Sequence, residues 1–226
     1  MNKVVLFHEN GSKKSEELYE NDVLHSQIKP AYAEWSNNGG KICEKWYLNG
    51  KLHNIDGASE TYWCCNGNKW SEKWHIDNYL HRYDGPAYTF WYVNIDVKES
   101  EKWYVNGKLH RIEGPANTYW YYDGNKKYEE WYVNGELHRI DGPAYTEWYE
   151  NGQKKLEEWY KKDHPHRCNG ASHVEWYENG NKKSEKWYMY GDLYRIDGPA
   201  YTEWYENGNI KLEEIHVNRI TILHIN

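Results

Sequence analysis

The chain has 226 residues, of which 38% are hydrophobic and 17% aromatic, and its formal net charge is −7. This acidic balance opposes nucleic acid as a partner, since phosphates are neutralised by clustered Lys and Arg, and it opposes anionic membranes more weakly. No stretch approaches the ~18 apolar residues of a membrane-spanning helix, and residues 1–11 hold no long apolar run typical of a secretion signal.

An internal repeat organises almost the entire chain. Two columns of mainly aromatic residues recur at steps of 28 residues, with a single step of 29 in each column. The first column contains Phe7, Trp35, Trp63, Trp91, Trp120, Trp148, Trp176 and Trp204. The second contains Leu18, Trp46, Trp74, Trp103, Trp131, Trp159, Trp187 and Ile215. Degenerate ends are typical of stacked arrays, so we predict one repeat domain over residues 1–226, with about eight units.

Each unit carries the signals of β-hairpins, taken here in chain order from Trp131 to Trp159. Asn134-Gly135 and Asn151-Gly152 predict type I′ turns, in which both central residues have positive φ. The Tyr-, Trp- and Thr-rich runs 144–150 and 155–160 predict strands. We interpret Asp141-Gly142-Pro143 as a bulge within one long strand, because a third reversal would point successive units in opposite directions; a full turn is the alternative. The predicted fold is all-β: an elongated single-layer antiparallel β-meander of two-stranded hairpin repeats.

The turn positions also predict register. They predict four facing pairs, namely Trp131 with His138, Tyr132 with Leu137, Glu130 with Arg139 and Trp148 with Lys155. Strict alternation places Trp131, His138, Trp148 and Trp159 on one face, and Tyr132, Tyr145, Tyr149 and Tyr160 on the other. We interpret the Trp columns as structural, with the chain folded around aromatic side chains. The Tyr set is the candidate partner-binding face, since Tyr is favoured at interfaces.

The repeating unit resembles a known family. The pattern W-Y-x-N-G-x-L-H-R-x-D-G-P-A-x-x-x-W-Y-x-N-G is carried best by residues 103–116, 131–152 and 187–208. It resembles MORN repeats, in a variant form built on Y-x-N-G-x-x hairpins, and is similar to repeat proteins of large DNA viruses. The resemblance implies an elongated single-layer sheet serving as a scaffold or dimerisation module, with lipid binding proposed for some members. The unit is longer and poorer in glycine than the familiar MORN pattern, which leaves the membrane role open.

Three sets of polar residues are candidates for a chemical site. Histidines recur at His25, His53, His81, His110, His138 and His166. Equivalent residues lie two strands or ~10 Å apart, too far to share a metal whose ligands lie at ~2.1 Å, so this column is interpreted as structural. The Arg column (Arg82, Arg111, Arg139, Arg167, Arg195) is predicted to pair with strand acids such as Glu130 and Glu158 or to be solvated, with anion binding as the alternative. His164, His166 and Cys168 form a small cluster that lacks an evident fourth metal ligand. We therefore predict no catalytic, cofactor or metal site.

These observations favour a non-enzymatic scaffold for protein–protein interaction. The alternatives are a carbohydrate-binding module that uses the aromatic rows and a membrane-surface module. The apolar tail predicts an edge strand able to pair with a second copy through Ile220, Ile222 and Leu223. The four cysteines follow no disulfide spacing, which predicts free thiols and a cytoplasmic protein, in the host cytoplasm if the source is viral.

Overall fold

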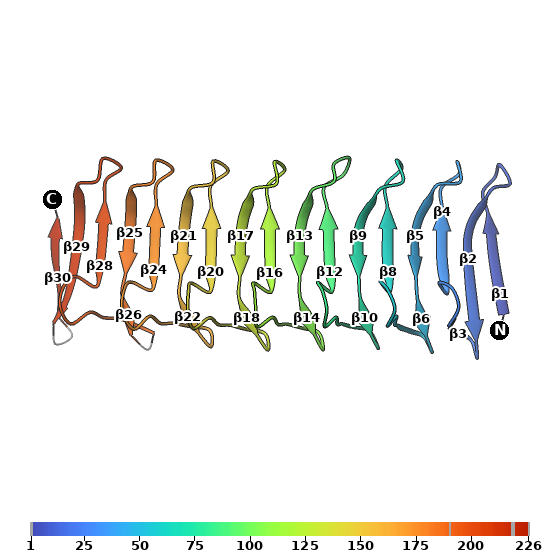
Figure 1. The fold of residues 1–226 in the computed structure, drawn as a ribbon, viewed down its shortest axis with the longest axis horizontal. Coiled ribbons are helices and arrows are strands. Elements are labelled where there is room, and N and C mark those ends of the chain that lie inside the picture. The colour runs from blue at the N-terminus through green and yellow to red at the C-terminus, as the bar shows by residue number, and fades with distance from the viewer. Residues whose placement is uncertain (1, 190, 218–219, 226) are drawn as a thin grey trace. The chain divides into compact units, whose positions relative to one another are not determined.

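The computed structural model describes residues 2–189, 191–217 and 220–225, in which the chain forms two compact units, Met1–Leu109 and His110–Asn226. Each unit is a single layer of antiparallel β-strands that follow one another in chain order (Figure 1). The predicted all-β, single-layer meander is confirmed. A single repeat domain over the whole chain stays a prediction.

The main strands of each unit pair with their neighbours in sequence. Those of the first unit are β1 (Asn2–Phe7), β2 (Lys13–Glu20), β4 (Tyr32–Trp35), β5 (Lys41–Lys45), β8 (Glu60–Trp63), β9 (Lys69–Lys73), β12 (Tyr88–Trp91) and β13 (Lys98–Lys102). Those of the second are β16 (Asn117–Trp120), β17 (Lys126–Glu130), β20 (Tyr145–Trp148), β21 (Lys154–Glu158), β24 (His173–Trp176), β25 (Lys182–Lys186), β28 (Tyr201–Trp204), β29 (Ile210–Val217) and β30 (Ile220–Ile225).

Small two-stranded hairpins extend one edge of each unit. They are β6 (Tyr47–Leu48) with β7 (Lys51–Leu52), β10 (His75–Ile76) with β11 (Tyr79–Leu80), β14 (Tyr104–Val105) with β15 (Lys108–Leu109), β18 (Tyr132–Val133) with β19 (Glu136–Leu137), β22 (Tyr160–Lys161) with β23 (His164–Pro165), and β26 (Tyr188–Met189) with β27 (Asp192–Leu193). In the first unit, β3 (Val23–Leu24) pairs instead with the end of β2. A full repeat therefore has a main hairpin and a small one.

The two Asn-Gly turns of a repeat differ in conformation. At the small hairpin, Asn134 (φ 56°) and Gly135 (φ 86°) both have positive φ, as predicted for a type I′ turn. At the main hairpin only Gly152 has positive φ (82°), so the type I′ prediction is wrong there. The Gly152 N–H donates to the Tyr149 carbonyl at 2.9 Å. The Asn151 side chain accepts the next N–H, that of Gln153, at 2.9 Å, which favours this longer loop.

Register is as predicted at the small hairpin and shifted beside the main turn. Tyr132 pairs with Leu137, and the His138 N–H donates to the Trp131 carbonyl at 2.8 Å. Trp148 pairs with Lys154 and not with Lys155, because a bulge inserts one extra residue. The predicted facing of Glu130 and Arg139 is also wrong: Glu130 pairs with Tyr145, because the chain leaves the sheet after His138.

The Asp-Gly-Pro-Ala segment is a bend that interrupts the strand. From the main hairpin into the small one the chain is nearly continuous, since only Trp131 separates β17 from β18. On the way back, residues 138–144 separate β19 from β20. The Trp131 N–H donates to the Ala144 carbonyl at 2.7 Å while its carbonyl accepts from His138. The backbone N–H and carbonyl of Trp131 are thus both hydrogen-bonded, to Ala144 and His138. Residues 139–143, which lie between these two partners in the sequence, are extruded from the sheet. The predicted bulge in one continuous strand is replaced by this larger excursion.

Small residues form the buried core, contrary to the expected aromatic core. Five alanines at the ends of the bends are 0% exposed, namely Ala31, Ala87, Ala116, Ala144 and Ala200. Ser59 and Ser172 take the corresponding position in two further repeats at 0% and 1%. The Trp residues of both columns are half-buried throughout. A single-layer sheet has no second layer to cover large rings, so only side chains close to the backbone lose all contact with water.

Side-chain hydrogen bonds join each repeat to the next. The Tyr149 hydroxyl donates to the Trp176 carbonyl at 2.8 Å, beside the main turns. At the opposite edge, His138 Nδ1 accepts the Lys162 backbone N–H at 3.2 Å. The same acceptor role recurs at His25, His53, His81 and His110. The histidine column therefore meets a structural need of the repeat.

Replacement of Glu16 by glutamine is expected to make the first unit less sensitive to acid. Glu16 binds Lys13 at 2.8 Å, Lys29 at 2.6 Å and Lys3 at 3.2 Å, and these ammonium groups, Lys13 foremost, lower the pKa of its carboxyl from 4.5 to about 2. A carboxyl with a lower pKa in the folded state adds stability above pH 4.5, which is lost as the pH falls towards 2.

Urea unfolding of the full chain at pH 7 and pH 3 measures this effect. We expect a smaller difference in midpoint between the two pH values for Glu16→Gln than for the parent chain. Glu44→Gln is the matched control, because Glu44 is paired with a single lysine, Lys41, at 2.8 Å. An unchanged pH difference in Glu16→Gln would contradict the prediction.

Candidate functional site

The bends present a repeated arrangement of arginine, tryptophan and aspartate. The Arg139 guanidinium carbon lies 3.8 Å from the centre of the Trp131 ring, and its Nε donates to the Asp141 carboxylate at 3.0 Å. A terminal nitrogen donates to the Pro143 carbonyl at 3.4 Å. One guanidinium thus binds an aromatic face, a carboxylate and the backbone of its own bend. The predicted pairing of this Arg column with Glu130 and Glu158 is wrong, because the bend carries its own acid.

The arrangement recurs with nearly constant geometry in both units. Arginine carbons lie 3.8–4.0 Å from ring centres in three further pairs, namely Arg82 over Trp74, Arg167 over Trp159 and Arg195 over Trp187. Arg82 and Arg195 also donate to Asp84 and Asp197, at 2.8 and 3.1 Å. Hydrogen bonds from Arg82 and Arg139 lower the pKa of Asp84 and Asp141 below the ordinary value. The bends of Arg82, Arg139 and Arg195 are therefore each held by a cation of their own and keep an exposed carboxylate.

Glycine leaves the space that the arginine needs. A Cβ added to Gly142 would lie 2.5 Å from the Arg139 guanidinium carbon, closer than real Cβ atoms approach their neighbours. Gly85 and Gly114 stand in the same relation to Arg82 and Arg111. These three glycines do not have positive φ, so their backbone conformation does not explain why glycine is present. The close approach of the arginine side chain does explain it.

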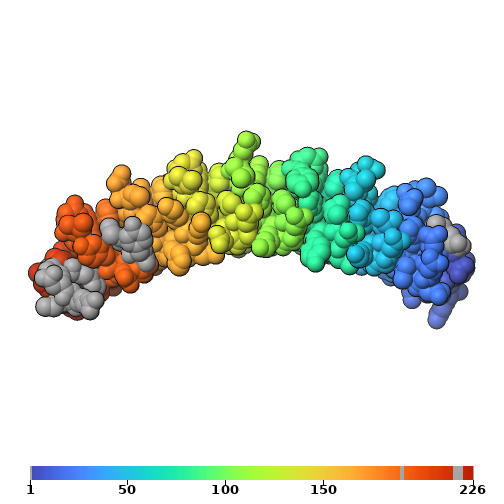
Figure 2. Space-filling model, turned by 90° about the horizontal axis from the view of Figure 1, so that it is seen from below, coloured from blue at the N-terminus to red at the C-terminus, as the bar shows by residue number. Residues whose placement is uncertain are grey.

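The bends also expose a row of large apolar side chains. The residue between the arginine and the acid is Tyr83 (79% exposed) in the first unit, and Ile112 (70%), Ile140 (87%) and Ile196 (81%) in the second. Ile55, at the same position of an earlier bend in the first unit, is 70% exposed. This edge faces the viewer in Figure 2, where the repeats of each unit follow one another in chain order. We name these five residues the apolar row.

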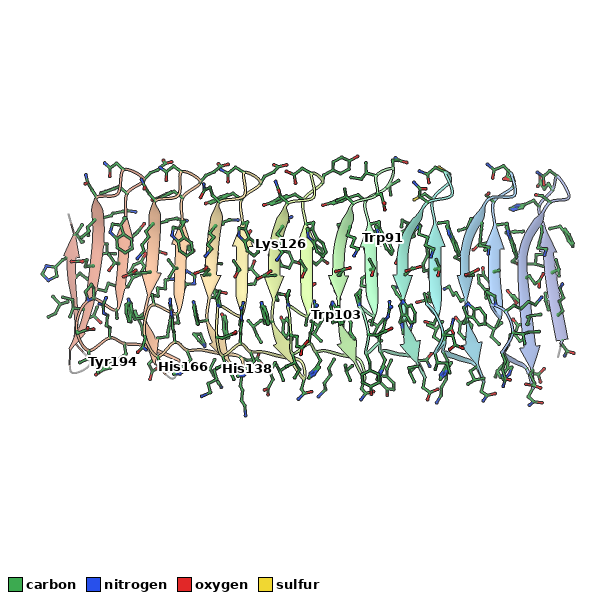
Figure 3. The ribbon with its side chains drawn as sticks, in the orientation of Figure 1. Trp91, Trp103, Lys126, His138, His166 and Tyr194 are labelled. Carbon is green, nitrogen blue, oxygen red and sulfur yellow. The ribbon has the colours of Figure 1, made fainter. Side chains whose placement is uncertain are left out.

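The two Trp columns lie at opposite ends of the main strands. Trp91 lies beside a main turn and Trp103 near the edge with the small hairpins, where His138, His166 and Tyr194 are also found (Figure 3). Ring faces beside the main turns are covered by lysines: Lys126 lies 5.7 Å from the Trp148 ring centre and Lys182 lies 5.6 Å from that of Trp204. Cations of the chain itself therefore occupy aromatic faces of both columns.

The predicted Tyr surface is half-buried and largely hydrogen-bonded. Tyr145 and Tyr160 donate to Glu147 and Glu158 at 3.4 and 3.5 Å, and Tyr149 donates to a backbone carbonyl. Burial raises the pKa of Tyr160 to about 12. Tyr132 is likewise half-buried. These rings are less accessible than the apolar row, which sequence reasoning missed although its isoleucines recur at the repeat spacing.

The residues predicted for edge pairing lie on β30. This strand pairs with β29, and Ile222 and Leu223 are 43% and 54% exposed. The backbone of Ile220 pairs with Val217, whereas its side chain lies outside the described part of the structure. Self-association through these residues stays a prediction.

Three bends lack the arginine, the acid or both, two in the first unit and one in the second. The first bend has Ser26 and Ile28 at these two positions. Asn54 replaces the arginine beside Trp46, and Asn169 replaces the acid beside Arg167. A groove of about 540 Å³ adjoins Trp46, and another of about 430 Å³ adjoins Trp159. The second is lined by Arg139, Lys161 and Arg167, with no carboxylate among its described lining residues. The departures are visible in the sequence, but their meaning depends on the geometry of the other bends.

In the part of the chain that the structure describes, no group of three or more His, Cys, Asp or Glu side chains is arranged so that it could hold a metal ion. Of the candidate cluster, Cys168 Sγ lies 3.5 Å from His166 Nε2, while His164 pairs with Lys161 in the small hairpin. Cys43, Cys64, Cys65 and Cys168 are free thiols. Among the described residues there is no helix of the length and hydrophobicity needed to cross a membrane.

Comparison with known proteins assigns no family. Neither the models of known protein families nor the curated proteins include a match to this chain.

Proposed function

We propose that the chain is a non-enzymatic repeat scaffold that binds a protein partner through the apolar row at its bends. The observation that carries this proposal is the exposure of Tyr83, Ile112, Ile140 and Ile196, each 70–87% accessible. Large apolar side chains exposed at the same position of several bends within each unit favour an interaction surface, since monomeric proteins rarely leave large apolar patches in water. The resemblance to MORN repeats supports the same proposal, with the cytoplasm as the proposed location.

Rigidity of the bends supports a binding role for the row. Within a unit, equivalent residues are two strands or ~10 Å apart. The Arg139 side chain is fixed by Trp131 and Asp141. Its backbone N–H donates to the Tyr160 carbonyl of the following repeat at 3.3 Å. Tyr83, Ile140 and Ile196 each follow such a fixed arginine, so these positions of the row are preorganised, which reduces the entropy lost on binding.

The carbohydrate and membrane alternatives receive less support. Stacking of sugars requires accessible ring faces, and arginines and lysines of the chain cover several of the Trp rings. Anionic lipid would meet the carboxylates beside the row, since Asp84, Asp141 and Asp197 side chains are each 81% exposed. Glycan-array binding and flotation with anionic liposomes test these two alternatives.

Affinity purification from cell extract, followed by mass spectrometry, tests the scaffold. Three baits are compared: the parent chain, the double variant Ile140→Ser/Ile196→Ser, and the control Val93→Ser, whose side chain is 50% exposed but lies outside the row. Exposed positions tolerate such changes within about 0.5 kcal/mol. We expect a partner that the parent and the control recover and the double variant loses. Equal recovery by all three baits contradicts the proposed surface.

A further inference from the structure

The bend at Trp46 has the partners of the repeated guanidinium site without an arginine of its own. At three other bends, those of Arg82, Arg139 and Arg195, the arginine lies over the second-column Trp and donates to the aspartate two residues later. Here Trp46 and Asp56 hold those two positions and Asn54 holds that of the arginine. None of the described cations lies over the Trp46 ring, and none of the described ion pairs involves Asp56.

Asn54 fulfils the backbone role of the arginine but does not reach the ring. Its Nδ2 donates to the Ala58 carbonyl at 3.1 Å, matching the bond from Arg139 to Pro143 at 3.4 Å. Its Oδ1 accepts the Asp56 N–H at 3.2 Å. The bend therefore keeps its backbone hydrogen bonds, while the aromatic face and the carboxylate remain available to an external group.

Arg167 shows which contact positions the cation. Its bend has Asn169 in place of the acid, yet the guanidinium carbon still lies 4.0 Å from the Trp159 ring centre and a terminal nitrogen donates to the Ala171 carbonyl at 3.1 Å. The Trp face and one carbonyl are thus sufficient to hold a guanidinium at this position. Trp46 offers the same face together with a carboxylate.

The groove beside Trp46 has room for a side chain and a negative balance of charge. Its volume is about 540 Å³, and its described lining includes Asp56, Glu44 and Glu72 against the single ammonium of Lys69. Glu44 and Glu72 bind Lys41 and Lys69 at 2.8 and 2.5 Å, so Asp56 is the uncompensated charge. A cationic guest is favoured over a neutral or anionic one.

We propose that this groove binds an arginine side chain of a protein partner, placed over Trp46 as the chain's own arginines are placed over Trp74 and Trp131. The proposal rests on the scaffold function and specifies its recognition chemistry. Arginine is favoured over lysine because a planar guanidinium stacks on an aromatic face and still directs N–H groups at a carboxylate in its plane. The flanking Ile55, 70% exposed, offers an apolar contact to the rest of the partner segment.

Nuclear magnetic resonance of indole N–H groups in the full chain tests the proposal. The probe is the peptide acetyl-Gly-Arg-Gly-amide, and the matched control replaces its arginine by citrulline, which has the same shape without the charge. We expect a saturable shift of the Trp46 indole signal with the arginine peptide and at least a tenfold weaker response with citrulline. No response at Trp46, or equal responses to both peptides, overturns the proposal.

Two variants of the chain test the site further, one by filling it and the other by creating a second copy of it. Asn54→Arg restores the repeat pattern, and its own guanidinium should occupy the Trp46 face and abolish the peptide response. Arg139→Asn copies the Trp46 bend at Trp131, so a peptide response should appear there. Retention of the full Trp46 response in a folded Asn54→Arg protein overturns the proposal. If the parent chain does not bind the peptide, but the Ile140→Ser/Ile196→Ser variant still loses a partner that the parent recovers, this site is rejected and the proposed scaffold function stands.

Discussion

Replacement of Ala144 by leucine is expected to lower the free energy of unfolding by about 1–3 kcal/mol, the usual cost of overpacking. Ala144 is 0% exposed, and its backbone is hydrogen-bonded to the neighbouring segment on either side of it. Its N–H donates to the Glu158 carbonyl at 2.8 Å and its carbonyl accepts from Trp131 at 2.7 Å. A longer side chain must separate strands that these bonds hold together. Urea unfolding of the full chain measures the change.

Serine at the same position is the matched control. Ser59 and Ser172 occupy the equivalent sites of other repeats, where they are 0% and 1% exposed. The Ser59 hydroxyl donates to the Lys73 carbonyl at 3.0 Å, so a hydroxyl at this site can be satisfied. We expect Ala144→Ser to cost less than about 1 kcal/mol. Similar costs for serine and leucine would show that the site is not limited by space.

The repeat and its strands were predictable because they depend on local chemistry. The Asn134-Gly135 pair adopts the positive φ values that its residues favour, and this turn sets the pairing of Tyr132 with Leu137. The same dipeptide at Asn151 behaves differently because the Asn151 side chain accepts the N–H of Gln153, outside the dipeptide, in a longer loop. The same loop geometry occurs at Ser36–Gly40 and Cys64–Asn68, so it is a property of the main turn.

The candidate site was less predictable because it depends on the bend. Strand alternation placed Arg139 opposite Glu130, whereas extrusion of residues 139–143 carries the arginine back over Trp131. The sequence shows the Arg, Asp and Gly columns, but not that they meet at one ring. Once that geometry is known, Asn54 and Asn169 become informative departures. The exposed isoleucines recur in the sequence too, yet the strand pattern alone did not distinguish their exposure from burial.

Replacement of Gly142 by alanine is expected to displace Arg139 and lower the free energy of unfolding by about 1–2 kcal/mol, the value of a partly desolvated cation–π contact. The new Cβ would lie 2.5 Å from the guanidinium carbon, so the arginine must leave the Trp131 ring and the Asp141 carboxylate. Gly142 does not have positive φ, so alanine suits its backbone. The effect is therefore expected to act through the arginine.

A double-mutant cycle separates the contribution of the arginine to this cost from that of the backbone. In an Arg139→Asn background, Gly142→Ala should cost less than about half as much, because no guanidinium crosses the glycine; coupling of this kind identifies residues in contact. Gly57→Ala is the natural counterpart, since its Cβ would meet only Asn54 Nδ2, at 3.2 Å. An equal cost in both backgrounds would mean that the bend itself requires glycine. A cost confined to the arginine background would mean that glycine is present to let a cation reach its tryptophan.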